Sequence, residues 1–177
     1  MTTPDDLGRA ELALLGRTVG RIGYGDDAHV FGPGQPLTLG GITIDGAPRL
    51  HGHSDGDVVL HAVADALLGA AGLGDLGRVF PAGPATPKGI ASGELLGDTV
   101  RRLATVGLRP AQLDLTVVAA RPHLGDRLEA MRAAIAGLVG LPIDRVNVKA
   151  STGNLAGPEG AGRGIAARAV VLVEPIR

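Results

Sequence analysis

The alternation of apolar and polar positions predicts an α/β protein, with strands and helices distributed along the whole chain. A nearly continuous apolar pattern over 57–73 predicts the most buried helix, with Ser54 or Asp55 as its N-cap. The Gly40-Gly41 pair lies between two short apolar runs and predicts a hairpin. Other strands are expected over 21–30 (interrupted by Gly23 and Gly25), 113–119, 145–150 and 165–173, and other helices over 5–19, 92–106 and 125–139.

Two segments lack a regular pattern and are expected to form loops. Residues 80–89 contain three prolines, which exclude regular structure over a length typical of a functional loop. Residues 152–164 are rich in glycine. Because the sequence contains neither an internal repeat nor an interdomain linker, we expect one compact α/β domain over 19–177, with helices covering a mixed β-sheet. Residues 1–18 are expected to be an N-terminal extension.

The composition fits a globular domain and excludes several classes of function. The chain has 177 residues, of which 45% are hydrophobic. The absence of cysteine excludes disulfides, thiolate zinc sites and a cysteine nucleophile, so His, Asp and Glu are the strong metal ligands available. A net charge of -1, with one Tyr, two Phe and no Trp, argues against nucleic acid or anionic membranes as partners. We therefore expect a small-molecule ligand.

The sequence gives no sign of export or membrane insertion. The longest apolar stretches, such as 66–73, carry glycines and fall far short of the roughly 20 residues that a membrane span needs. Residues 1–6 are polar and acidic, without the basic and apolar regions of a signal peptide. We expect a cytoplasmic protein.

Histidines and aspartates cluster in the first half of the chain. Asp27 and His29 are separated by one residue, so on a strand both side chains project from the same face. Asp57, His61 and Asp65 are spaced by four and share one stripe of the predicted helix. The carboxylate of Asp27 and the imidazoles of His29 and His61 suit zinc or another first-row divalent ion with an open position. Taken singly, however, an Asp-x-His pair is more often a turn or a surface pair.

The turn His53-Ser54-Asp55-Gly56-Asp57 directly precedes that helix. Free N–H groups and the helix dipole favour an anion such as phosphate at this place. An ordinary capping turn explains the same residues equally well.

Longer motifs occur in an order that carries a family resemblance. They read GDDAH over 25–29, HSDGDVVLHA over 53–62, DALLGA over 65–70, LGDLG over 73–77, DLT over 114–116, VNVKA over 146–150 and GIA over 164–166. In this order they resemble the 2-C-methyl-D-erythritol 2,4-cyclodiphosphate synthase family, over about residues 19–174.

The resemblance implies an activity and an assembly. Enzymes of this family convert 4-diphosphocytidyl-2-C-methyl-D-erythritol 2-phosphate into the 2,4-cyclodiphosphate and release CMP, a step of the non-mevalonate route to isoprenoid precursors. The reaction is an intramolecular phosphoryl transfer, so it asks for positioning and charge neutralisation. The resemblance also implies a homotrimer with each active site between adjacent subunits.

The resemblance assigns roles to particular residues. It implies zinc, or another divalent transition metal, on Asp27, His29 and His61, and phosphate contacts from His53 and Thr152. Lys88 matches a lysine in a loop beside the active site, and Asp65 is expected either near the metal or in a salt bridge along the helix. The implied substrate-binding residues are Ser54, Asp57, Asp75, Leu76, Gly77, Ala119, Pro122, His123, Ala150 and Ser151.

Several positions depart from the family pattern. Asn154 stands where the family has a glutamate for Mg²⁺ or Mn²⁺ on the diphosphate, and an amide is a weaker ligand for magnesium than a carboxylate. Ala82 and Pro84 replace two aspartates, His123 replaces a lysine and Ala161 an arginine. These departures leave two alternatives open. One is a divergent cyclase for another nucleoside-diphosphate-linked polyol phosphate, and the other is a non-catalytic trimeric ligand-binding protein that keeps zinc.

Overall fold

The computed structural model describes residues 3, 20–84 and 86–176. The helix expected over 5–19 lies outside the described residues, as does the N-terminal extension apart from Thr3. Within the described ranges, no helix has the length and apolar character needed to cross a membrane.

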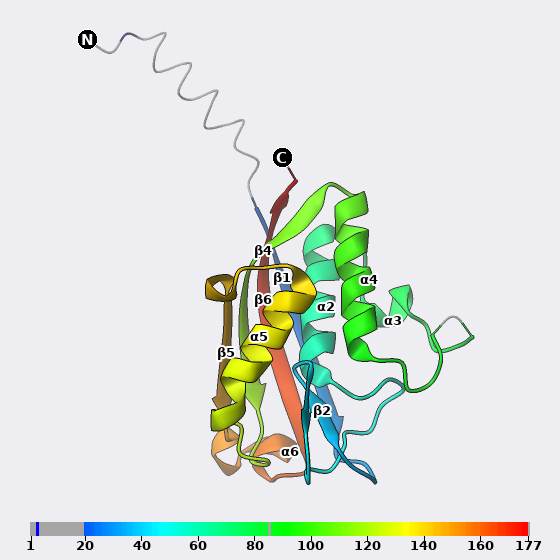
Figure 1. The fold of residues 1–177 in the computed structure, drawn as a ribbon, viewed down its shortest axis with the longest axis vertical. Helices are drawn as coiled ribbons and strands as arrows, with labels where there is room; N and C mark the ends of the chain where they lie inside the picture. Colours follow the sequence, from blue (N-terminus) through cyan, green and yellow to red (C-terminus); the bar gives the residue numbers. More distant parts are fainter. Residues whose placement is uncertain (1–2, 4–19, 85, 177) are drawn as a thin grey trace.

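A four-stranded mixed sheet forms the centre of the fold (Figure 1). Its strands are β1 (Arg21–Val30), β6 (Gly164–Pro175), β4 (Leu108–Val118) and β5 (Val146–Ser151), in that spatial order. Strand β4 is parallel to β5, and the β1·β6 and β4·β6 pairs are antiparallel. The mixed sheet expected from the sequence is therefore confirmed.

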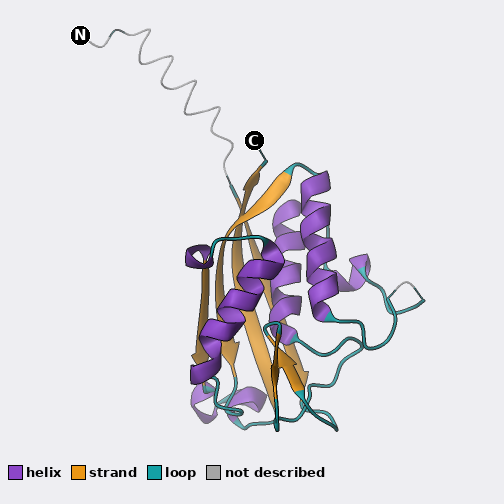
Figure 2. Cartoon of the chain, in the orientation of Figure 1, coloured by secondary structure: helices purple, strands orange, loops and turns teal. Residues whose placement is uncertain are grey.

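Three long helices cover the sheet on one side, and Figure 2 shows them in front of the strands. They are α2 (Val58–Ala71), α4 (Ser92–Thr105) and α5 (Leu128–Val139). The expected hairpin is also present, as β2 (Leu37–Leu39) and β3 (Ile42–Ile44). Leucine, valine and alanine side chains from these helices and from the sheet make up the core, as the scarcity of aromatic residues requires.

Strand β4 begins at Leu108, five positions before the strand expected from the sequence. Its first residues pair with the end of β6, starting from Leu108 opposite Pro175. The pairing register shifts between Pro110 and Gln112. A bulge accommodates proline, which cannot donate a ladder hydrogen bond, so the strand continues through Pro110.

Short helical turns occupy segments that the sequence predicted as loops or as part of a longer helix. The expected helix over 125–139 is a 3-10 turn followed by α5, and the glycine-rich segment 152–164 contains two short turns. A one-turn helix after α2 was not expected. These turns are α3 (Leu76–Val79), η1 (Gly125–Arg127), η2 (Ile143–Arg145), η3 (Gly153–Leu155) and α6 (Gly157–Gly160).

Strand β1 is continuous, so the expected interruption at Gly23 and Gly25 is wrong. All ten of its residues pair with β6. The two glycines face helix α2 at very short range, since a Cβ atom on Gly23 would lie 1.9 Å from Ala66 O and one on Gly25 would lie 2.0 Å from Ala62 O. Here glycine allows helix and strand backbones to touch, a known use of glycine within a strand.

Asp57 is the N-cap of α2, which corrects the expectation of Ser54 or Asp55. Its carboxylate accepts the N–H groups of Val59 and Leu60, both at 3.1 Å, as an N-cap does. The same carboxylate accepts two further N–H groups at 2.8 Å, from Gly40 and Gly41 of the hairpin turn. Asp57 thus joins the hairpin to the start of α2.

Gly25→Ala should destabilise the protein by about 3 kcal/mol, because the new methyl group would overlap the backbone of α2. The urea denaturation midpoint measures this loss. Gly69→Ala is the matched control within α2, since a Cβ atom there meets nothing within 4 Å, and it should stabilise by about 1 kcal/mol through helix propensity. Equal effects of the two substitutions would refute the close-contact account.

Candidate active site

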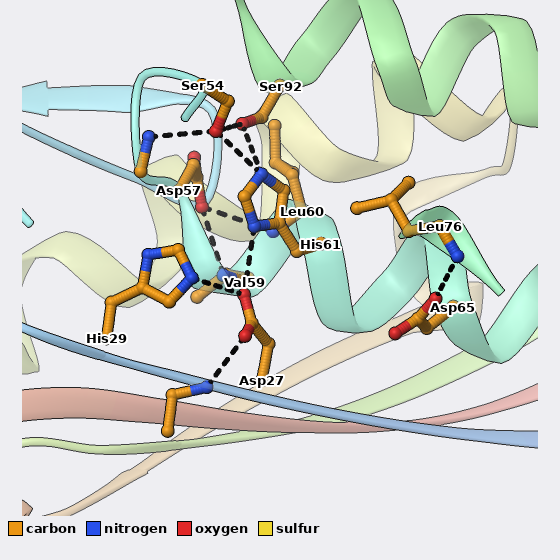
Figure 3. A network of polar contacts seen from close by, with 12 residues as sticks. Asp27, His29, Ser54, Asp57, Val59, Leu60, His61, Asp65, Leu76 and Ser92 are labelled. Carbon is orange, nitrogen blue, oxygen red and sulfur yellow. Dashed lines mark hydrogen bonds and ion pairs between the residues drawn. The ribbon is translucent and has the colours of Figure 1, made fainter. Parts of the chain in front are cut away.

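Asp27, His29 and His61 meet where strand β1 faces the first turn of α2 (Figure 3). Asp27 Oδ2 lies 2.9 Å from His61 Nδ1 and 3.3 Å from His29 Nε2. One ligand atom from each residue lies within 4.8 Å of the other two. The structure therefore gathers the three residues that the spacing grouped, and of the predicted helix stripe only His61 takes part.

The metal triad, Asp27 with His29 and His61, suits a cation. Burial raises the pKa of Asp27, but the hydrogen bonds to His29 and His61 outweigh burial and hold that pKa well below its ordinary value. The side chain is thus an anionic ligand at neutral pH. Among the described residues, His29 Nδ1 is a buried nitrogen with no hydrogen-bond partner, an arrangement that is costly unless the ring finds another interaction. One carboxylate and two imidazoles are a donor set that fits zinc and related divalent ions.

A cavity of about 190 Å³ opens beside the triad. His53 and Ser54, from the turn before α2, lie on its wall, and a hydrogen bond of 2.9 Å from His53 Nε2 to Thr86 O orients the His53 ring. The residues lining this metal-side cavity are His29, His53, Ser54, His61, Leu76, Gly77, Phe80, Thr86, Ile90 and Leu95. The predicted anion-binding turn therefore borders the same space as two of the metal ligands.

Asp57 is not available to a substrate through its side chain. The residue is fully buried, and its carboxylate accepts four backbone N–H groups. Its role in the structure is to hold the turn and the hairpin in place, rather than the substrate contact that the family resemblance implied.

Asp65 and Asp75 organise the cavity wall. The Asp65 carboxylate accepts the N–H of Leu76 at 2.6 Å, which ties that lining residue to α2. In the described part of the chain Asp65 forms no ion pair, so the salt bridge expected along the helix is absent. Asp75 caps α3 by accepting the N–H of Arg78 at 2.9 Å, and it is half exposed beside the cavity rather than lining it.

A second cavity, of about 200 Å³, lies at the ends of β4 and β5. It shares no lining residue with the metal-side cavity. Five of the residues predicted from the resemblance line this strand-end cavity: Ala119, His123, Ala150, Ser151 and Thr152. Pro122 follows a cis peptide bond in the same loop. Within one chain the structure thus separates His53 from Thr152.

Lys88 lines a third depression, together with Arg49 and His51. The lysine lies near the end of the proline-rich loop, where Gly89 N–H donates to His53 O at 2.7 Å and ties the loop to the turn before α2. Lys88 is therefore next to the turn but not on the wall of the metal-side cavity.

Ser92 is a residue of the site that the sequence did not single out, and it contacts Asp55 of the predicted turn. Ser92 Oγ lies 2.9 Å from His61 Nε2, and its hydroxyl donates to Asp55 Oδ1. A serine at the beginning of a helix is usually a cap, and 31 positions separate it from His61. Only the packing of α4 against α2 brings the two together.

Comparisons with known proteins place these residues in a family. Residues 20–174 match the model of the YgbB family. The chain is 49% identical over 153 residues to a 2-C-methyl-D-erythritol 2,4-cyclodiphosphate synthase of Burkholderia thailandensis, covering 86% of this chain and 94% of that protein. It is 45% identical over 177 residues to a bifunctional enzyme IspD/IspF of an Anaeromyxobacter species, covering all of this chain but only 45% of that protein.

A solved structure shares the fold. It is a 2C-methyl-D-erythritol-2,4-cyclodiphosphate synthase in a form with bound CDP, with a TM-score of 0.77 and 38% identity. The match covers 87% of this chain and 100% of that one. This agrees with the fold class expected from the sequence.

Asp65→Asn should stabilise the metal-free protein near pH 7. Burial raises the pKa of Asp65 despite the hydrogen bond from Leu76. Because the pKa is higher in the folded state, ionising Asp65 costs stability. None of this cost is present below the ordinary pKa of about 3.9, and it grows as pH rises above that value. Asparagine avoids this cost, so its advantage in urea midpoint should be present at pH 7, fade as pH falls and be absent below pH ~4.

Asp114→Asn is the control of opposite sign. The hydrogen bond from Lys149 lowers the pKa of Asp114, so this substitution should cost stability at pH 7 rather than add it. An advantage of Asp65→Asn that does not change with pH would contradict the burial argument.

Proposed function

Since the chain belongs to the YgbB family, we propose that it converts 4-diphosphocytidyl-2-C-methyl-D-erythritol 2-phosphate into 2-C-methyl-D-erythritol 2,4-cyclodiphosphate with release of CMP. The oxygen of the 2-phosphate attacks the β-phosphorus, and the bond from that phosphorus to the CMP oxygen breaks. The observation that carries this proposal is the metal triad on the wall of a cavity that also presents His53 and Ser54. The charged, nucleotide-linked substrate agrees with the cytoplasmic location expected from the sequence.

The metal side of the site is built to receive phosphate. Asp27, His29 and His61 would hold a divalent ion, for which zinc is our proposal, and such an ion neutralises phosphate oxygens as a Lewis acid. Ser54 Oγ and the His53 ring come from the turn at the start of α2, so they can approach the same phosphates from one side. In-line phosphoryl transfer depends mainly on this positioning and charge neutralisation.

The strand-end cavity is our proposed site for the cytidine. Small residues line it, including Ala119 and Ala150, so the backbone is accessible to a base, and none of its lining residues is a Phe, Tyr or Trp that a base could stack on. The CDP bound to a related synthase supports a cytidine nucleotide as the ligand. Thr152 lies on the same wall and would contact the phosphates from the cytidine side.

The two cavities fit a site shared between subunits. One substrate must meet both His53 and Thr152, yet within one chain these residues line separate cavities. The face of β1 opposite the helices offers an interface, because Ile22 and Tyr24 are 74% and 59% exposed there, beside Val170 of β6. We therefore infer a homotrimer in which neighbouring copies complete each site.

Asn154 is not suited to hold a second cation. It is exposed in η3 with a φ of 48°, a left-handed conformation that asparagine tolerates better than most residues. Its amide oxygen is a poorer ligand for magnesium than a carboxylate. We propose that any Mg²⁺ or Mn²⁺ reaches the site with the diphosphate of the substrate.

A divergent substrate is the second candidate, because two of the changes lie in the loop beside the metal-side cavity. Ala82 and Pro84 stand where the family resemblance implies aspartates, and the loop that carries them leads into Thr86 of the metal-side cavity. The metal triad is unaffected by these changes. A cyclase for another nucleoside-diphosphate-linked polyol phosphate would release its nucleotide in the same way.

His61→Ala should remove the bound metal and lower CMP release by at least about 100-fold, while the folded assembly persists. Metal analysis, a CMP assay and sedimentation of the same preparation measure the three effects. His51→Ala, which removes a histidine outside the triad, should keep its metal. An unfolded or monomeric His61→Ala protein would assign the metal a structural role and favour the non-catalytic alternative.

Mixing two inactive variants tests whether the site lies between subunits. His53→Ala and Thr152→Ala should each be inactive, yet trimers reassembled from an equal mixture should regain about a quarter of wild-type activity, the statistical share of sites with both halves intact. His53→Ala mixed with Ser54→Ala is the control, because both changes affect the same half and cannot complement each other. Failure of the first pair to recover would refute the shared site.

A further inference from the structure

The ring nitrogen of His61 that faces away from Asp27 lies beside two buried hydroxyl groups. His61 Nε2 lies 2.9 Å from Ser54 Oγ and 2.9 Å from Ser92 Oγ, while Nδ1 faces Asp27 Oδ2 (Figure 3). The three residues Ser54, Ser92 and His61 are 5%, 1% and 8% exposed. Water therefore does not compete for these contacts at the outer nitrogen of the ring.

Asp55 determines the direction of the Ser92 contact. Its carboxylate accepts the Ser92 hydroxyl through Oδ1 and the Ser92 N–H through Oδ2, the latter at 3.1 Å. A serine hydroxyl has one proton, and a carboxylate can only accept. Because the Ser92 proton goes to Asp55, Ser92 Oγ can only accept from His61, so Nε2 carries a proton. The Asp27 carboxylate also only accepts, so a metal at Nδ1 would take the place of a proton there.

Ser54 and Ser92 are not equivalent. Ser54 lines the metal-side cavity and accepts the N–H of Gly56 at 3.1 Å, so its hydroxyl proton can still turn toward a ligand. Ser92 does not line the cavity, and its proton is already committed to Asp55; the Ser54 oxygen is farther from it, at 3.4 Å. Ser92 thus cannot bind substrate, and its contact with the site runs through His61.

We propose that Asp55 and Ser92 are positioning residues that hold His61 by its Nε2–H, so that Nδ1 is aimed at the metal position and can bind the ion. The proposal rests on the proposed metal function of the triad. Partners on the outer nitrogen of a metal-binding histidine set its tautomer and orientation in this way, and their loss typically costs about 10-fold to 100-fold in metal affinity.

Asp55→Asn and Ser92→Ala disrupt the chain of contacts by different routes. An asparagine amide can donate to Ser92 Oγ, which frees the Ser92 proton to point at Nε2 and opposes the Nε2–H form that metal binding through Nδ1 requires. Ser92→Ala removes the acceptor and leaves Ser54, which can either donate or accept. Thr99→Val is the matched control, since Thr99 is a buried hydroxyl of the same helix that bonds only to Leu95 O, at 2.9 Å.

Two measurements test the proposal without relying on turnover. Proton–nitrogen NMR of the zinc-loaded proteins reports the exchange of the His61 Nε2–H proton, and competition with a chelator reports zinc affinity. We expect slow exchange of this proton in the wild type and in Thr99→Val, faster exchange in the other two variants, and a loss of about 10-fold to 100-fold in their zinc affinity. Thermal melting verifies that each variant is folded.

The proposal is overturned if both variants keep the slow exchange of the Nε2–H proton and wild-type zinc affinity, even when their melting temperatures fall as a purely structural contact would require. A wild-type protein that releases no CMP would instead count against the proposed function. Because that result does not alter the NMR and zinc-affinity measurements, the two failures are distinguishable.

Discussion

The direct contact between helix α2 and strand β1 is the constraint on which the site depends. Gly23 and Gly25 let the backbone of the strand touch the carbonyl groups of Ala62 and Ala66. The two glycines and Asp27 lie on one face of β1. The face that contacts the helix therefore also presents Asp27 to His61. A side chain in place of either glycine would push the helix outward, and the metal ligands would separate with it.

Contacts with the hairpin and with α4 also fix the position of the first turn of α2. The Asp57 carboxylate accepts four backbone N–H groups, two from the hairpin and two from α2, and this sets where the helix begins. Asp55 joins the turn to the start of α4 through Ser92. His61 is therefore held through its backbone by the cap, through Nδ1 by Asp27 and through Nε2 by the hydroxyls, and little freedom remains for the ring. Such preorganisation suits a reaction that depends on positioning charged phosphates.

The sequence predicted the elements and the metal triad because both depend on local spacing. An Asp-x-His pair on a strand and a histidine on a buried helix form local patterns that a sequence shows. The helix that covers a strand is not visible in the sequence, so Gly23 and Gly25 were interpreted as interruptions. The N-cap was misplaced because Ser54, Asp55 and Asp57 are all good caps, and the N–H groups of Gly40 and Gly41 decide among them. Ser92 was missed for a similar reason, since its contact with His61 exists only after two helices pack. The separation of His53 from Thr152 likewise follows from the folded chain and not from either motif.

Phosphorus NMR of the purified, zinc-loaded protein with 4-diphosphocytidyl-2-C-methyl-D-erythritol 2-phosphate and magnesium tests the central claim most directly, because it identifies both products at once. The account predicts that the substrate signals give way to those of CMP and the cyclic diphosphate in equal amounts. Unchanged substrate in the presence of an intact, metal-loaded assembly would contradict it and would direct attention to a different nucleotide-linked substrate or to a binding role.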